Sequence, residues 1–169
     1  MKGDELMNTK KLTVLSISVA LAMILSFVES QIPPFVAIPG IKIGLANIVT
    51  VFLLYKLGWK EAAAVSVVRV ALSSLLFGSA ASFFYSASGA VLSFAVMVII
   101  KMLPLFSEIS VSIVGGVFHN VGQIICACII MENGGIVTYL PPLLISGTVA
   151  GIAVGALSAL LLKKLEKII

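Results

Sequence analysis

The sequence predicts an all-α membrane protein, a bundle of six transmembrane helices with both termini in the cytoplasm. Of its 169 residues, 60% are hydrophobic and 11% are charged, and the mean hydropathy is +1.22. An ordinary soluble domain has about 45–50% apolar and about 25% charged residues. The apolar residues fall into long runs separated by proline, glycine and lysine, and nearly all the lysines lie in alternate connections.

The first two helices are defined by the breakers that follow them. Each apolar run must form a whole helix or be shielded by protein, because unpaired backbone groups are costly in lipid. The first run, 12–32, stops at Pro33, and after the loop PPFVAIPGIK a shorter run covers 43–57. The tripeptide GWK then ends this hairpin.

Four further runs follow with short connections, at 61–77, 82–103, 107–131 and 138–162. A hydrocarbon core of about 30 Å needs about 20 helical residues per crossing, which leaves room for six crossings and no sizeable soluble domain. We therefore expect one domain, the bundle of residues 12–169, after an N-terminal tail of residues 1–11. The first helix resembles a signal peptide but lacks a small-residue cleavage site, so we expect it to be retained.

The orientation follows from the lysines. Cytoplasmic connections carry an excess of lysine and arginine. With six crossings, one side of the membrane receives Lys2, Lys10, Lys11, Lys56, Lys60, Lys101, Lys163, Lys164 and Lys167, whereas the other receives Lys42. Both termini are therefore expected in the cytoplasm and the proline-rich first loop outside. The positive charge indicates topology, not binding to nucleic acid.

Small residues recur at four-residue spacing in two of the predicted helices. Such stripes let helix backbones approach closely in lipid, where packing drives helix association. The sixth helix carries Gly147, Gly151 and Gly155, and the first carries Ser18, Ala22 and Ser26. Each stripe serves either packing within the bundle or docking to another membrane subunit, and the sequence leaves both interpretations open.

Two ionisable residues lie deep within predicted helices, where such groups are costly and are candidates for function. Arg69 is about eight residues, or about 12 Å, into the third helix, and His119 has a similar depth in the fifth. Arg69 either forms a buried ion pair with Glu29 or, with Lys42, binds an anionic ligand group. His119 is either a binding residue or a hydrogen-bonded core histidine.

The other polar side chains lean toward the outer half of the bundle. Glu29 is near the outer end of the first helix, and Asn47 is in the outer part of the second. On the fifth helix, the four-residue spacing of His119 and Gln123 places both on one face. We expect a pocket below the first loop, facing Arg69, with these substrate-binding residues: Arg69, His119, Asn120, Gln123, Asn47, Glu29 and Lys42.

Several functions lack their motifs in this sequence. There is no G-x-x-x-x-G-K-[ST] loop for ATP hydrolysis. Asp4 is the only aspartate, so no paired acidic motif could hold magnesium for diphosphate chemistry. Cys126 and Cys128 point about 200° apart on a helix, which favours two free thiols over a redox centre. We therefore predict no catalytic residue, no metal and no cofactor.

Two stretches carry a resemblance to a known family. The segment PGIKIGLANIVTVFLLYKLG, Pro39 to Gly58, and the segment HNVGQ, His119 to Gln123, resemble the membrane family called heptaprenyl diphosphate synthase component I, or Gx transporter family. The resemblance covers nearly the whole chain after the first ten residues. That family is similar to the S components of energy-coupling factor (ECF) transporters, six-helix proteins that capture vitamins or their precursors.

The resemblance implies an S-component-like bundle and two kinds of partner. S components dock onto a membrane coupling subunit that works with two ATPases, and they bind their ligand near the outer face under the first loop. Docking commonly uses an Ala-x-x-x-Ala pattern on the first helix. The nearest equivalents here are Ser16/Ala20 and Ser18/Ala22, a departure from that pattern.

Three functions remain open at this point. The first is a multi-pass cell-membrane subunit that binds a small anionic or heteroaromatic metabolite, such as a vitamin, for uptake. The second is a noncatalytic membrane component of heptaprenyl diphosphate synthesis, because the two aspartate-rich motifs of the catalytic synthase are absent. The third is a membrane subunit of a flavin or quinone electron-transfer system. None of the three is an enzyme by its own residues.

Overall fold

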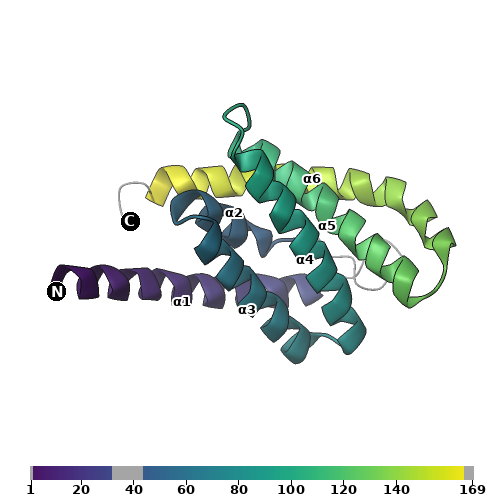
Figure 1. Ribbon diagram of the computed structural model, residues 1–169, viewed down its shortest axis with the longest axis horizontal. Coiled ribbons are helices and arrows are strands. Elements are labelled where there is room, and N and C mark those ends of the chain that lie inside the picture. The colour runs from purple at the N-terminus through teal and green to yellow at the C-terminus, as the bar shows by residue number, and fades with distance from the viewer. Residues whose placement is uncertain (1, 32–43, 166–169) are drawn as a thin grey trace.

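A bundle of helices forms the structure, a computed structural model that describes residues 2–31 and 44–165, with side chains from Thr9 onward. This part of the chain holds six α-helices and one short 3-10 helix (Figure 1). In chain order they are α1 (Lys2–Gln31), α2 (Asn47–Lys56), α3 (Trp59–Phe77), α4 (Ala80–Lys101), α5 (Glu108–Ile130), η1 (Gly134–Tyr139) and α6 (Leu140–Leu165).

Each predicted apolar run corresponds to one of these helices. Most boundaries agree within three residues, but α2 begins at Asn47 and not at residue 43, because a turn at Gly44, with φ +83°, precedes it. Helix α1 begins at Lys2, so the predicted tail continues the first helix; no proline interrupts this stretch. Helix α6 begins at Leu140, after η1, and not at Thr138. The reason is that Pro141 and Pro142 follow directly, and proline, which lacks an N–H, is tolerated in the first turn of a helix.

Four segments of the described chain are long and apolar enough to cross a membrane. They are Thr9–Gln31, Ala80–Lys101, Glu108–Ile130 and Gly134–Leu165. The remaining two helices differ for separate reasons: α2 is apolar but short, whereas α3 contains Lys60, Glu61 and Arg69. The fold is thus that of a helical membrane protein.

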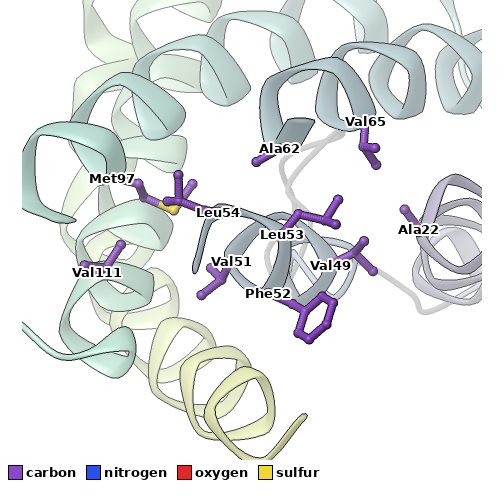
Figure 2. Close-up of a cluster of buried hydrophobic side chains, with 10 residues drawn as sticks. All are labelled: Ala22, Val49, Val51, Phe52, Leu53, Leu54, Ala62, Val65, Met97 and Val111. Atoms are coloured by element: carbon purple, nitrogen blue, oxygen red, sulfur yellow. The ribbon is translucent and has the colours of Figure 1, made fainter. Parts of the chain in front are cut away.

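Helix α2 lies at the centre of the bundle, as Figure 2 shows. Every residue from Ile48 to Leu54 is buried, and a helix that is apolar all round has to be covered on all sides. Its partners are Ala22 of α1, Val65 of α3, Met97 of α4 and Val111 of α5, while Ser158 of α6 donates a hydrogen bond to the Ile48 carbonyl at 3.2 Å.

Helices α4, α5 and α6 pack through small residues at backbone distance. A Cβ added to Gly147 would lie 2.8 Å from the Gly116 carbonyl oxygen, and one added to Gly151 would lie 2.6 Å from the Ile113 Cα. On the opposite side of α5, a Cβ on Gly122 would lie 2.9 Å from the Gly89 Cα of α4. The glycine stripe of α6, including Gly155, therefore serves packing against α5 within the bundle.

Helices α1 and α3 run side by side in the same direction. Lys11 forms an ion pair with Glu61 near one end, and the rings of Phe27 and Phe77 meet near the other at a centroid distance of 5.2 Å. The predicted small-residue stripe of α1, Ser18, Ala22 and Ser26, is buried. The outward side chains of both helices are large and apolar, including Leu12, Ile17, Ile24, Val67, Leu72 and Leu75.

The lysine-bearing helix termini gather at one end of the bundle. The Nζ of Lys101, at the end of α4, donates a hydrogen bond to the Leu54 carbonyl near the end of α2 and lies 5.1 Å from the centre of the Tyr55 ring. The start of α1 and the end of α6 lie at this same end (Figure 1). Helix α2 is thereby held at its C-terminus by a cation, which also suits the negative end of its dipole.

The glycine packing predicts that Gly116→Ala destabilises the protein. The new Cβ would overlap the Gly147 carbonyl oxygen, and a backbone atom cannot turn aside, so α5 and α6 have to move apart. We expect a net loss of at least about 1 kcal/mol in a reversible unfolding measurement in mixed micelles, although alanine favours a helix by about 1 kcal/mol over glycine.

The matched control for this substitution is Gly134→Ala, because a Cβ at Gly134 meets nothing within 4 Å. This variant should unfold within about 0.5 kcal/mol of the unmodified protein. A Gly116→Ala protein as stable as the Gly134→Ala protein would contradict the backbone contact between α5 and α6.

Candidate functional site

The predicted binding residues are distributed over four helices. Glu29 lies in the last turn of α1, Asn47 at the start of α2, and Arg69 in the middle of α3. His119, Asn120 and Gln123 lie in the second half of α5. Lys42 lies outside the described residues, so its predicted role is not addressed by the structure.

Glu29 connects α1 to the segment that leads into α2. Its side chain is 5% exposed, and its Oε1 accepts a hydrogen bond from the Gly44 N–H. Gly44 has φ +83°, in the left-handed region that favours glycine, and its carbonyl accepts from the Asn47 N–H at 2.9 Å. One carboxylate thus holds the turn from which the central helix begins.

Arg69 faces the same region from α3. Glu29 is the charged group that acts on Arg69 electrostatically, in line with the ion pair considered from the sequence. The Nε of Arg69 is buried and, within the described part of the chain, has no hydrogen-bond partner. Glu29, Gly44 and Arg69 are called the charged cluster below. It joins α1, α3 and the start of α2.

Asn47 lies at the N-terminus of α2, next in the chain to the charged cluster. Its Nδ2 points to the Met97 sulfur of α4 at 3.9 Å, and thioether sulfur is a weak acceptor. No side chain caps this helix terminus, which carries the positive end of the helix dipole. The terminus therefore adds partial positive charge beside Glu29.

His119 and Gln123 face α4. A Cβ added to Gly89 of α4 would lie 2.9 Å from the His119 Cε1 and 3.0 Å from the Gln123 Cγ. Both side chains therefore pack over the same glycine, as their four-residue spacing predicts. Gln123 is 5% exposed, whereas His119 is partly exposed. We call these two residues the α5 pair.

Asn120 points to a different neighbour. It is 3% exposed, and its Nδ2 donates a 2.7 Å hydrogen bond to the Leu143 carbonyl of α6. The same nitrogen lies 2.7 Å from the position that a Cβ on Gly147 would take. The structure thus gives Asn120 a packing contact between α5 and α6, separate from the α5 pair.

Helix α4 lies between α3, which carries Arg69, and α5, which carries the α5 pair. It packs against both α3 and α5. Arg69 lies about eight residues before the end of α3, and Gly89 about nine residues after the start of α4, so both are about 12–14 Å from the short α3–α4 connection. Arg69 and the α5 pair therefore share a depth in the bundle, although α3 and α5 are not an extensively packed pair.

Sequence reasoning missed two parts of this arrangement. Gly44 and Gly89 have no side chain to attract notice. They could have been found only as isolated glycines, a signal for a positive φ or a close backbone approach.

Among the side chains that the structure describes, those of residues 9–31 and 44–165, no group of three or more His, Cys, Asp or Glu could hold a metal ion. Cys126 and Cys128 are both free thiols. Cys128 packs against the small apolar cluster of Ile124, Ile136 and Leu143. The side chains described at the candidate site are therefore hydrogen-bonding and charged groups.

The fold and the site together define a class: a helical membrane protein with charged and amide side chains buried within its bundle. A family model described as heptaprenyl diphosphate synthase component I matches residues 18–161, and the chain belongs to this family. The matched range includes α2 to α5 in full, parts of α1 and α6, and every predicted binding residue. No curated protein and no solved structure matches the chain.

The charged cluster predicts an energetic coupling between Glu29 and Arg69. Glu29→Gln keeps an acceptor for the Gly44 N–H but leaves the arginine charge without its counter-charge, and Arg69→Met leaves the carboxylate alone. Each single variant should be destabilised by about 2–4 kcal/mol. The double variant should lose less than the sum, with a coupling of at least about 1 kcal/mol in an unfolding cycle.

Glu29→Gln combined with Lys163→Met provides the control, because Lys163 is exposed at the far end of α6. Those two changes should add within about 0.5 kcal/mol. Additivity of the Glu29 and Arg69 changes would contradict an interaction between the two charges.

Proposed function

We propose that this chain is the membrane substrate-binding subunit of an uptake system for a small metabolite, with six crossings and both termini in the cytoplasm. One observation carries the proposal: Arg69 lies within the bundle, and its buried Nε makes no hydrogen bond to any described residue. A charge in a membrane helix is expensive, and a purely structural arginine would be expected to use its donors on protein acceptors.

The proposed topology is supported by where the lysines lie. The termini of α2 and α4 that carry Lys56 and Lys101 meet through the Leu54 carbonyl, and Lys11 meets the start of α3 through Glu61. A cytoplasmic location of this end follows the positive-inside pattern. Helix α2 would then be a short crossing shielded by its neighbours, since buried backbone away from lipid can be irregular at membrane depth.

The proposed ligand is a small anionic or heteroaromatic metabolite that enters from the outer face. Arg69 supplies a planar set of donors suited to carboxylate or phosphate. The α5 pair and Asn47 would supply hydrogen bonds to a ring or amide, and Lys42 a further positive charge. Vitamins and their precursors fit this description.

Partners would provide the energy for uptake. The sequence has no phosphate-binding loop for ATP, so transport would need an external energy source or a partner, and we propose a membrane coupling subunit with ATPases. Of the two small-residue pairs on α1, Ser18 and Ala22 are buried within the bundle. Ser16 and Ala20 are exposed, and they are the pair through which α1 would meet a coupling subunit.

Ligand retention tests this proposal directly. Native mass spectrometry of the protein, freshly purified in mild detergent, should show one bound small molecule that is absent from Arg69→Gln and reduced in His119→Ala. Loss of a charge-assisted contact costs about 2–5 kcal/mol, or more than about 30-fold in affinity. Lys163→Ala is the control and should retain the ligand. If neither site variant changes retention or cellular uptake, the proposal fails.

A second function is favoured by the description of the family, heptaprenyl diphosphate synthase component I. In that case the chain would be a noncatalytic membrane subunit that assists a soluble synthase. Affinity purification under mild conditions separates the two: a co-purified soluble prenyl synthase supports the second function, whereas a coupling protein with two ATPases supports the first.

The proposed topology predicts the behaviour of two reporter fusions. A green fluorescent protein fused after Ile169 should fluoresce, because it folds in the cytoplasm. Alkaline phosphatase fused after Gly134, in the α5–α6 connection, should be active, because that connection is expected outside. Phosphatase activity at the C-terminus, or its absence at Gly134, would contradict six crossings with internal termini.

A further inference from the structure

The connection between α4 and α5 is apolar, whereas the α5–α6 connection contains Glu132 and Asn133. Its residues 102–106, called the α4–α5 turn below, read MLPLF and carry no charge. Leu105 is 91% exposed, more than any other large apolar side chain in the described part of the chain. All the large apolar side chains of this turn are exposed: Met102, Leu103, Leu105 and Phe106.

The packing of α6 against α5 fixes the depth at which α5 begins. A Cβ added to Gly155 would lie 2.7 Å from the Ile109 Cα, so Gly155 is level with the first turn of α5. Lys163, the first lysine of α6, follows about eight residues later, which is about 12 Å along the helix. The start of α5 therefore lies about 12 Å inside the level of that lysine.

Helix α6 presents a lipid-facing surface over this stretch. No charged residue lies between Gly155 and Lys163, and the side chains of Leu157 and Leu160 are exposed. In a transmembrane helix, the lysines mark the membrane surface and the exposed leucines before them face acyl chains. Figure 1 shows that the α4–α5 turn projects from the side of the bundle while α6 continues past it. The turn and the exposed leucines of α6 thus lie at a similar depth.

The backbone of the α4–α5 turn suits an environment with little water. Unpaired backbone groups are costly in lipid. The N–H groups of Met102, Leu103 and Phe106 each donate to a carbonyl within the turn or the end of α4, and Pro104 has no N–H. The Leu105 N–H has no acceptor in the described part of the chain. This pattern fits the boundary between acyl chains and headgroups better than the bilayer centre.

Lys101, directly before the turn, is directed into the protein. Its Nζ donates to the Leu54 carbonyl and lies 5.1 Å from the centre of the Tyr55 ring. A lysine in contact with bulk water needs neither partner, whereas one beside lipid requires polar contacts in place of water. The inward direction of Lys101 is therefore a second sign that lipid surrounds this connection.

We propose that the α4–α5 turn is inserted into the lipid leaflet on the lysine side of the bundle. Its apolar side chains lie among the acyl chains, and its backbone lies at the headgroup boundary. The partner of this exposed surface is the bilayer itself. This inference does not rest on the proposed function, because it holds equally for a transport subunit and for a synthase subunit.

Tryptophan fluorescence in vesicles tests the insertion. Trp59 is the only tryptophan, so a Trp59→Phe protein provides a dark background for Leu105→Trp. In phosphatidylcholine vesicles with brominated acyl chains, Leu105→Trp should be quenched at least about half as strongly as Leu160→Trp on the lipid face of α6. Iodide added to the water should quench it weakly.

Lys164→Trp in the same background is the matched control. Lys164 is exposed near the end of α6, and tryptophan itself favours the membrane interface, so the control carries the same preference at the level of the lysines. Quenching by brominated lipid should be at least about twofold weaker there than for Leu105→Trp. Met102→Trp, a second probe at a 79% exposed position, should behave like Leu105→Trp.

Two outcomes overturn the insertion. If iodide quenches Leu105→Trp and Met102→Trp strongly, and brominated lipid quenches them no more than Lys164→Trp, the turn lies in water. If neither agent quenches the two probes, protein covers the turn, such as a second copy of the chain. Strong quenching by brominated lipid together with weak quenching by iodide supports the insertion.

Discussion

The burial of α2 is the constraint on which the rest of the structure depends. Seven of its residues, Ile48 to Leu54, are buried, and a helix this short leaves termini that lipid cannot satisfy. Other helices therefore have to hold both termini. Lys101 of α4 donates a hydrogen bond to the Leu54 carbonyl near the end of α2, and Glu29 of α1 accepts one from Gly44 in the turn before its start. One cation and one buried carboxylate thus bond to backbone groups at or next to the two ends of α2. The charged cluster lies where the N-terminus of α2 meets α1 and α3.

The positions of the helices could be predicted because prolines and glycines divide the apolar runs. The main boundary differences have local causes. No breaker separates residues 2–11 from the first run, the turn at Gly44 places the start of α2 at Asn47, and Pro141 shifts the start of α6 past Thr138. The lysine pattern predicts six crossings, whereas hydropathy and length identify four spans in the described part of the chain. Helix α2 is too short, and α3 carries too many charges, to be identified as a span from hydropathy. Whether either helix crosses the membrane depends on how neighbouring helices shield it, and no local sequence pattern shows this.

Some contacts of the candidate site could be predicted from the sequence, and others could not. An interaction of Arg69 with Glu29 could be anticipated, because a lone buried charge needs a counter-charge. The shared face of His119 and Gln123 followed from helical periodicity. The direction of Asn120 did not, because its partner, the Leu143 carbonyl, depends on how α6 packs against α5. Contacts between a side chain and a distant backbone group, such as Glu29 with Gly44, require knowledge of where the chain returns.

The close packing of α5 between two glycine-lined neighbours has a consequence for how this sequence can change. Gly116 and Gly147 each occupy the space that a side chain of the other would need. On the opposite face of α5, a Cβ on Gly122 would meet the Gly89 backbone, and one on Gly89 would meet His119 and Gln123. A larger residue at one member of a pair cannot be accommodated by shrinking the other, which is already the smallest possible. A residue larger than glycine at Gly116 or Gly147 is therefore accommodated only if α5 and α6 move apart along their whole contact.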